Sequence, residues 1–323
     1  MSPTEPEPDN PAGGRGPVAP GSGWPGDPAE PDTPVAADPG AARHYAESAR
    51  TLDELDAQVS VCRACPRLVG WREQVAATGR RSYAGQRYWG RPVPGWGVEA
   101  PRILLVGLAP AAHGGNRTGR VFTGDRSGDH LAAALHRVGL AAQPTSDHAG
   151  DGQRLSGPRG SVRMTAAVHC APPQNRPDRQ EAAACAPWLD AELRLLAPGL
   201  AVVVALGGIA WTAALAAIAR LGVPSARPRP RFGHGASWQL PQPLPGGSRR
   251  VVLLGSYHPS QQNTFTGRLT PAMTDSVLAR AAELSDATGG GAPGTGEPWS
   301  DGGGGHSRRE AGTPAHQDHE TTG

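Results

Sequence analysis

The chain has 323 residues, a formal net charge of +2 and four cysteines. The N-terminal sequence MSPTEPEPDN has neither a basic nor an apolar segment, so we expect no signal peptide and a cytoplasmic protein with reduced cysteines. One uncharged stretch, Gly199 to Ala219, is long enough to cross a bilayer. Gly207-Gly208 divides it into a β-branched strand and an alanine-rich helix, so we predict no membrane span.

Both ends of the chain are poor in large apolar residues, and we predict that both are disordered. Residues 1–42 form an acidic, Pro/Gly-rich tail with a net charge of −6, and residues 285–323 form a Gly-rich tail with −4. Because the whole chain carries +2, residues 43–284 carry +12, and they are numerous enough for one domain. Arginine supplies this charge and suits phosphate oxygens, which favours a nucleic-acid partner. The arginine bias of a GC-rich genome is the alternative explanation.

Between the tails, strand and helix patterns alternate. The first predicted helix covers residues 43–61, with Thr51 as an N-cap. The predicted strands cover residues 102–108, 163–170, 201–206 and 250–256. The predicted helices between and after them cover residues 128–138, with Ser127 as N-cap, 178–197, 209–220 and 271–284. Residues 67–100 show little periodicity, 141–160 match no element, and 222–249 read as a surface excursion. This order predicts a three-layer α/β/α sandwich around a four-stranded parallel sheet.

The four cysteines lie inside the predicted domain. Cys62 and Cys65 are separated by two residues, and Cys170 and Cys185 by fourteen. Four reduced thiols suit zinc or an iron–sulfur cluster, and their spacing does not separate the two. The alternative is that Cys170 and Cys185 are ordinary buried thiols.

Polar and aromatic side chains follow the predicted strands, where open α/β sheets place their chemistry. They include His113, Asn116, Phe122, Asp125, Asn175, His258 and Asn263. No P-loop, dinucleotide or serine-hydrolase motif is present. An aromatic face, amides that match a base edge and a histidine that can donate to a developing oxyanion suit cleavage of an N-glycosidic bond.

Two of these segments resemble a known family. The segments GLAPAAHGGNRTGRVFTGD (107–125) and HPSQQNTFTGRLTP (258–271) resemble the signature motifs of the uracil-DNA glycosylase superfamily, specifically its type-B (family 5) branch. AAVHCAPPQNRP (166–177), with the cysteine spacing, is similar to the iron–sulfur members. The resemblance covers about residues 55–285. It implies an α/β/α fold, a [4Fe–4S] cluster and a monofunctional hydrolase that removes uracil from DNA in base-excision repair and leaves an abasic site.

The resemblance also implies individual roles. The expected cluster ligands are Cys62, Cys65, Cys170 and Cys185. Phe122 would stack on the flipped base, His258 would stabilise the departing base anion, and Asp125 would assist water or the sugar cation. Asn263 and Asn175 would hold the base or its deoxyribose.

The end of the first strand departs from the wider superfamily. Leu108, Ala109, Ala111 and Ala112 supply no carboxylate where other branches carry Asp or Glu, which is a type-B trait. This shifts the acid role to Asp125, and such a plain pocket, lined in part by Ala111, implies that hypoxanthine is accepted beside uracil.

Several of these residues have structural alternatives. Asp125 could instead cap a helix, Phe122 could be core, and His113 could only bond within its loop. Arg268 and Leu269 are candidates for a wedge in the DNA groove, with packing as the alternative for Leu269.

The expected partner is DNA containing uracil or deaminated bases, double-stranded first and single-stranded second, bound by a monomer. The rival hypothesis is a non-catalytic iron–sulfur protein that binds damaged DNA. An electron-transfer module is a third reading, and the basic core argues against it.

Overall fold

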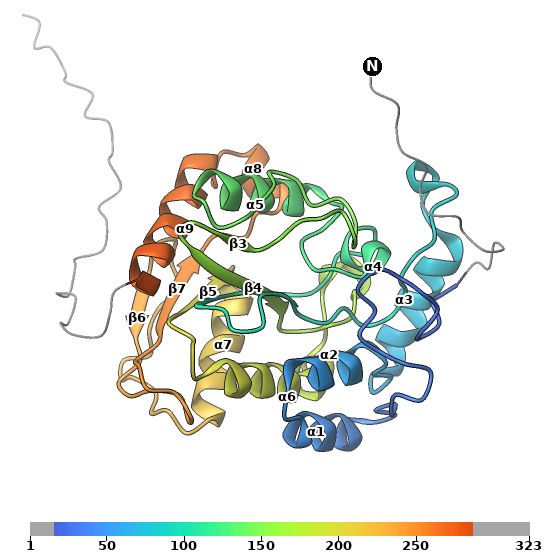
Figure 1. The fold of residues 1–323 in the computed structure, drawn as a ribbon, viewed down its shortest axis with the longest axis horizontal. Coiled ribbons are helices and arrows are strands. Elements are labelled where there is room, and N and C mark those ends of the chain that lie inside the picture. Colours follow the sequence, from blue (N-terminus) through green and yellow to red (C-terminus); the bar gives the residue numbers. More distant parts are fainter. Residues whose placement is uncertain (1–15, 287–323) are drawn as a thin grey trace, which may run out of the picture. The chain divides into compact units, whose positions relative to one another are not determined.

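The protein is described by a computed structural model over residues 16–286, in which helices cover both faces of a central sheet (Figure 1). The sheet has seven strands in the order β1-β4-β2-β5-β7-β6, with β3 paired to β4 off this path. Its four parallel strands are β2 (Ile103–Gly107), β4 (Gly160–Ala166), β5 (Val202–Leu206) and β7 (Val252–Ser256). They confirm the predicted α/β class and its parallel centre.

The sheet is wider than the four strands predicted. Short antiparallel strands extend it, namely β1 (Trp96–Gly97), β3 (Ser156–Gly157) and β6 (Ser237–Gln239). Each is only two or three residues long, which is too short to leave a period-2 pattern in the sequence. The predicted surface excursion over 222–249 therefore contains β6, an edge of the sheet.

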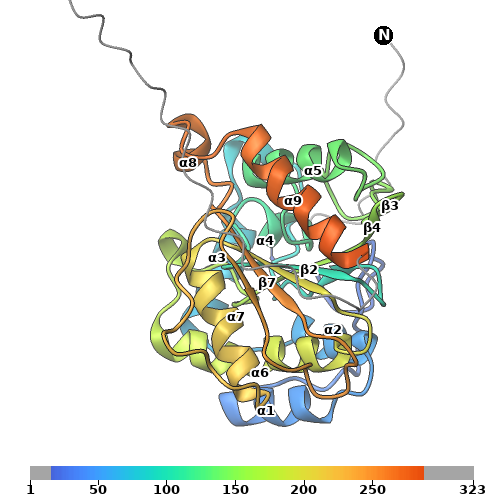
Figure 2. The same cartoon turned by 90° about the vertical axis from the view of Figure 1, so that its left-hand side faces the viewer.

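Alternate residues of the parallel strands feed two hydrophobic cores. Leu104 and Val203 face one core and Ile103 and Val202 face the other, and all four side chains are fully buried. Burial on both faces is what a parallel sheet requires. The first core contains residues of α1 (Pro39–Ser48), α2 (Leu52–Ser60), α6 (Arg179–Leu196) and α7 (Gly208–Arg220). The second contains residues of α5 (Arg126–Arg137) and α9 (Pro271–Asp286), and Figure 2 shows the two groups on opposite sides.

Further helices lie in segments whose sequence shows little periodicity. These are α3 (Pro66–Thr78), η1 (Arg81–Tyr83), α4 (Gly115–Thr118), η2 (Pro173–Asn175) and α8 (Gln261–Phe265). The predicted helix over 43–61 is two helices, α1 and α2, that meet at Thr51. Thr51 caps α2 as predicted, since its side chain accepts from the backbone N–H of Glu54 at 3.2 Å.

No helix in the described range is long and apolar enough to cross a membrane.

Residues 16–42 are not a disordered tail, so the predicted boundary at residue 42 is wrong. Val18 and Ala36 are buried, and the Asp27 carboxylate accepts two hydrogen bonds from the Arg91 guanidinium, at 2.7 and 2.9 Å. The composition was misleading because this segment is held by few contacts: the Asp27–Arg91 ion pair, small buried apolar residues and the packing of Trp24 on Trp89. At the other end α9 runs to Asp286, two residues beyond the predicted domain end. Residues 1–15 and 287–323 lie outside the described residues.

The buried ion pair predicts that the N-terminal segment contributes to stability. We expect Asp27→Asn to lower the free energy of unfolding by about 3–5 kcal/mol, because Arg91 would keep a buried charge without its partner. Urea unfolding followed by circular dichroism measures this loss. Asp190→Asn is the matched control: its pair with Arg220 is partly exposed, so we expect a loss of only about 0–1 kcal/mol. Equal losses in the two variants would contradict a structural role for the segment.

Candidate active site

Glycines at the ends of two neighbouring strands allow two predicted site residues to approach each other. Gly107 ends β2, and a Cβ atom there would lie 2.6 Å from Cζ of Phe122. Gly207 follows β5, and a Cβ atom there would lie 3.3 Å from Cβ of His258. The rings of Phe122 and His258 consequently lie with centroids 6.2 Å apart and planes tilted by 41°. Side chains that are 136 positions apart in the sequence thus share one edge of the sheet.

Phe122 adopts a backbone conformation that is unusual for a bulky residue. Its φ is +52°, in the left-handed region that costs a non-glycine residue free energy and that is enriched at functional sites. The start of α5 lies very close to this turn, since a Cβ atom at Gly128 would be only 2.5 Å from the carbonyl oxygen of Phe122. The side chain packs against the second core and remains half-buried. Phe122 therefore fits both predictions: part of its side chain contacts the core, and part remains accessible.

His258 and Asn263 form one unit at the end of β7. The side-chain N–H of Asn263 donates to the carbonyl oxygen of His258 at 2.9 Å, and Ser260 caps α8 by accepting from the backbone N–H of Asn263 at 3.4 Å. Burial lowers the pKa of His258 to about 4, since a buried imidazolium loses its hydration. His258 is therefore neutral near pH 7 and carries one N–H donor.

Asp125 caps α5, so the structural alternative for this residue is realised. One carboxylate oxygen accepts from the backbone N–H groups of Ser127, at 2.9 Å, and Gly128, at 3.0 Å. The predicted cap Ser127 is therefore wrong: α5 begins at Arg126, two residues earlier than predicted, because the Asp125 carboxylate reaches two free N–H groups at once. The other oxygen lies against Gly114, where a side chain would collide with it. Burial raises the pKa of Asp125, and the two N–H donors oppose that rise.

Arg117 holds together the loop that carries Phe122 and Asp125, a role that the sequence did not reveal. Its guanidinium donates to the carbonyl oxygens of His113 at 2.9 Å and Gly124 at 2.8 Å, and to the side chain of Gln86 at 2.8 Å. A side chain at Gly124 would collide with it. The fork of one buried arginine therefore fixes both ends of this turn.

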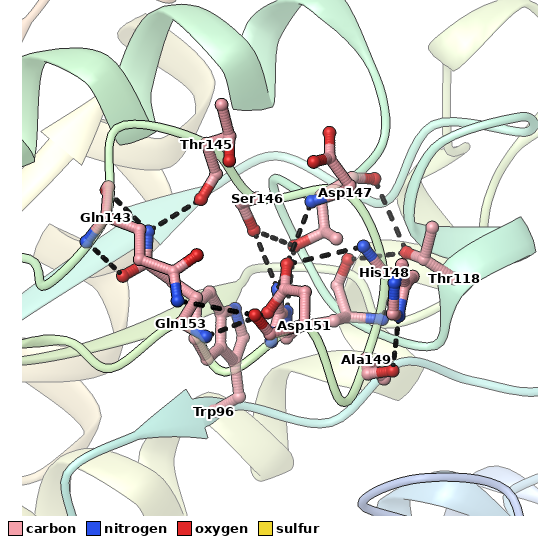
Figure 3. Close-up of polar contacts among 12 residues, drawn as sticks. Trp96, Thr118, Gln143, Thr145, Ser146, Asp147, His148, Ala149, Asp151 and Gln153 are labelled. Atoms are coloured by element: carbon pink, nitrogen blue, oxygen red, sulfur yellow. Dashed lines mark hydrogen bonds and ion pairs between the residues drawn. The ribbon is translucent and has the colours of Figure 1, made fainter. Parts of the chain in front are cut away.

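The segment 141–160, which the sequence left without an assignment, supports the same loop from outside (Figure 3). Asp151 accepts a hydrogen bond from Arg120 at 2.5 Å, and Ser146 accepts a second from the same guanidinium at 3.0 Å. Gln153 links two parts of the segment, because its side chain donates to the carbonyl oxygens of Gln143 and Thr145, each at 2.7 Å. Polar side chains replace apolar packing in this segment, which explains the absence of a hydrophobic period.

Two predicted residues of the first loop make structural contacts. The ring of His113 shares a hydrogen bond of 2.9 Å with the hydroxyl of Tyr88, so it bonds outside its loop and not only within it. Ala111 contributes its carbonyl oxygen, which accepts from the backbone N–H groups of Gly114 and Asn116 at 3.2 and 3.0 Å. Neither side chain contacts the Phe122–His258 pair through a described hydrogen bond.

Three other predicted residues lie apart from the Phe122–His258 pair. Asn175 is exposed in η2 with φ +56°, a second strained backbone position. Leu269 is 1% exposed, so it packs in the interior and is not a wedge. Arg268 is exposed and lies over the ring of Tyr257, 4.9 Å from its centroid.

Phe265 is the exposed apolar residue that the sequence analysis missed. It ends α8, its residue is 67% exposed, and the guanidinium of Arg126 lies 5.2 Å from its ring centroid. This contact joins α8 to the first residue of α5, and the two helices lie beside each other in Figure 1. An aromatic residue without apolar neighbours in the segment QQNTFTGR was the available signal.

The four predicted cysteine ligands converge. All four line one small cavity between α2, α3, the loop after β4 and α6, together with apolar residues such as Leu68 and Trp188. Burial, together with the neighbouring thiols, raises the pKa of Cys62 to about 11 and that of Cys65 to about 12. Among residues 16–286, no three His, Cys, Asp or Glu side chains surround a point that could hold a single metal ion.

Comparison with known proteins agrees with this geometry. The sequence profile of the uracil DNA glycosylase superfamily matches residues 94–282. The chain therefore belongs to the uracil-DNA glycosylase superfamily.

Several relatives carry the more specific name type-5 uracil-DNA glycosylase. One from Mycobacterium tuberculosis is 56% identical over 271 residues, which are 84% of this chain and 96% of the relative. Another from Thermus thermophilus is 52% identical over 228 residues, 70% of this chain and 95% of the relative. A third from Pyrobaculum aerophilum is 45% identical over 221 residues, 68% and 88% of the two chains. These relatives confirm the resemblance to the type-B (family 5) branch.

The buried imidazole of His258 predicts a pH dependence of stability. Between the ordinary histidine pKa near 6.5 and the lowered pKa of about 4, the unfolded chain binds a proton at this residue and the folded chain does not. Stability must therefore decrease as the pH falls through this window. We expect wild type to lose more free energy of unfolding between pH 7 and pH 5 than His258→Gln does. Equal losses in urea titrations at the two pH values would contradict the buried neutral imidazole.

Proposed function

We propose that this protein is a uracil-DNA glycosylase that hydrolyses the N-glycosidic bond of uracil in DNA and leaves an abasic site. The observation that carries the proposal is the pair formed by the Phe122 ring and the neutral His258 at the strand ends. The 56% identity to relatives named type-5 uracil-DNA glycosylase supports the same reaction. A non-catalytic damage-binding protein would not need both a buried neutral histidine and a strained aromatic turn at one site.

In the proposed reaction a flipped uracil stacks on Phe122, because an enzyme that acts on a base must first remove it from the helix. The bond between C1′ and N1 breaks, and its electron pair leaves with the base. The N–H of neutral His258 donates to the uracil carbonyl oxygen on which negative charge develops. A neutral histidine is suited to this role because it stabilises the anion by a hydrogen bond and keeps its own proton.

The sugar is left as an oxocarbenium-like cation, which a water molecule attacks at C1′. Asp125 supplies negative charge near this cation and is the acceptor for the proton that water loses. Because the amide nitrogen of Asn263 is held by the His258 carbonyl, its amide oxygen is available to accept from the base or the sugar. The absence of a carboxylate among Leu108, Ala109, Ala111 and Ala112 is the basis for proposing hypoxanthine as a second substrate.

For DNA binding we propose that Phe265 takes the wedge role first assigned to Leu269. Phe265 is exposed beside Arg126, whereas Leu269 is buried. Arg268 and Arg126 are exposed on the same segment and its neighbour, and they suit phosphates of a bound duplex. Single-stranded DNA would be accepted as well, since the flipped nucleotide needs no partner strand.

We further propose that Cys62, Cys65, Cys170 and Cys185 hold a [4Fe–4S] cluster. Their convergence on one cavity with an apolar lining suits a cluster ligated by four thiolates. The bound cluster would link the segment before α3 to the loop after β4 and to α6. The reaction itself takes no step through it.

The first test is base release from labelled duplexes that contain one uracil or one hypoxanthine, followed by alkaline cleavage of abasic sites. We expect cleavage at both bases and none in an undamaged duplex. His258→Ala should slow release by roughly 10²–10³-fold, the cost of one donor to a developing oxyanion, while binding to the duplex is kept. His136→Ala, an exposed histidine on α5, is the control and should release uracil at the wild-type rate. No release by wild type, with DNA still bound, would favour the damage-binding alternative.

The wedge proposal has its own test. Phe265→Ser should weaken binding of uracil-containing duplex roughly tenfold, which is typical for the loss of one stacking contact with a base. The effect should be smaller on single-stranded DNA, where no base pair has to be opened. Val35→Ser removes another exposed apolar residue, in the N-terminal segment, and should leave both affinities unchanged. Equal affinities for Phe265→Ser and wild type would exclude Phe265 from the DNA contact.

A further inference from the structure

Beside the four cysteines lies a buried arginine whose charge is poorly balanced by the described residues. Arg72 of α3 is 1% exposed. Its guanidinium donates to the sulfur of Cys170 at 3.0 Å and to the carbonyl oxygen of Cys62 at 3.2 Å. Its Nε–H is buried and has no hydrogen-bond partner within residues 16–286.

The carboxylate nearest to Arg72 is already engaged. One oxygen of Glu73 lies 3.9 Å from the Arg72 guanidinium, which is beyond hydrogen-bond distance. The Glu73 carboxylate instead accepts two hydrogen bonds from Arg63, at 2.5 and 3.3 Å. The negative charge of Glu73 therefore balances little of the positive charge of Arg72.

Other buried arginines in the chain show what a balanced site looks like. Arg163, which is 3% exposed, donates to both Asp56 and Glu192 at 2.6 to 2.7 Å. Arg91 has the carboxylate of Asp27 in the same way. Arg72 has a thiol and a carbonyl where these arginines have carboxylates.

A buried cation without a counter-charge is costly, and a neutral thiol does not supply one because it is only a weak acceptor. The site is balanced if the sulfur of Cys170 belongs to an anionic group. Four cysteine thiolates around a [4Fe–4S] centre form such a group, because the ligand charges exceed the charge of the iron–sulfur core.

We infer that Arg72 is the cationic partner of the cysteine-bound cluster and donates to its ligand Cys170. This inference rests on the proposed [4Fe–4S] cluster. Arg72 is a positioning residue: its charge stabilises the more negative, reduced state of the cluster relative to the oxidised state.

Arg72 also joins the cluster region to the candidate active site. Its backbone carbonyl accepts from the side-chain N–H of Asn116 at 3.2 Å, and Asn116 is completely buried in α4 of the first motif loop. The carbonyl of Asn116 in turn accepts from the backbone N–H of Gly90 at 3.0 Å. The helix that carries the counter-charge is therefore bonded directly to the loop that positions Phe122 and Asp125.

The test uses full-length protein purified without oxygen. Iron per chain and the midpoint potential of the cluster are measured, the latter by potentiometric titration of its visible absorbance. Arg72→Gln and Arg72→Met remove the charge, and Arg72→Lys keeps it. Arg163→Lys is the matched control, because it alters another buried arginine that contacts none of the cysteines.

We expect both neutral variants to have a more negative midpoint potential than wild type. Their ratio of reduced to oxidised cluster at a fixed potential should fall roughly ten- to hundredfold, the equivalent of one hydrogen bond to a charged group. Arg72→Lys and Arg163→Lys should keep the wild-type potential. A merely structural role for Arg72 would not produce this dependence on charge.

An unchanged potential in the neutral variants would overturn the inference about Arg72. Where neither neutral variant folds, Arg72→Lys decides: a wild-type potential supports the charge role, and a more negative potential despite the retained charge overturns it. Wild-type protein that contains no iron and no visible absorbance would instead refute the cluster itself. The failure of the cluster proposal is thus distinguishable from the failure of the inference about Arg72.

Discussion

The close approach of Phe122 and His258 to two glycines at the strand ends is the constraint on which the candidate site depends. Gly107 and Gly207 lie at the ends of adjacent parallel strands; a Cβ atom at Gly107 would collide with the Phe122 ring, and one at Gly207 would lie 3.3 Å from Cβ of His258. The site is therefore built against the backbone of the sheet rather than on mobile loops. Such a position restricts both rings, and it also removes water from His258, which is why that histidine stays neutral.

Arginine is the second organising element of the fold. The chain has no lysine among its 31 basic residues, and within residues 16–286 five arginines are buried: Arg72, Arg91, Arg117, Arg120 and Arg163. Each binds loop carbonyls, carboxylates or a thiol with its planar fork, which lysine cannot reproduce. Part of the +12 charge of residues 43–284 is therefore used inside the protein. The overall charge is consequently weaker support for DNA binding than two exposed arginines, Arg126 beside Phe265 and Arg268 over Tyr257.

The loops outside the two motifs have a consistent function. Arg117 and Arg120 extend from the first motif loop to the segments 83–88 and 143–153, and each segment holds the loop by hydrogen bonds. On the cysteine side, α3 begins at Pro66, directly after Cys65, and bonds to the same loop through Arg72. The N-terminal segment packs on Trp89, whose backbone N–H donates to the carbonyl of Arg117. Segments without hydrophobic periodicity thus position the loop that carries Phe122 and Asp125.

The sequence by itself determined the four parallel strands, the major helices after them, the cysteine set and the two motif loops. These features depend on local periodicity, on caps and on residue spacing, all of which a linear chain displays. Only the tertiary structure decided which residues share the site. It buried Leu269 and left Phe265 exposed. It also made Asp125 the N-cap of α5 and positioned Arg72 beside Cys170. Burial and long-range contacts depend on how distant segments pack, and no local pattern encodes them.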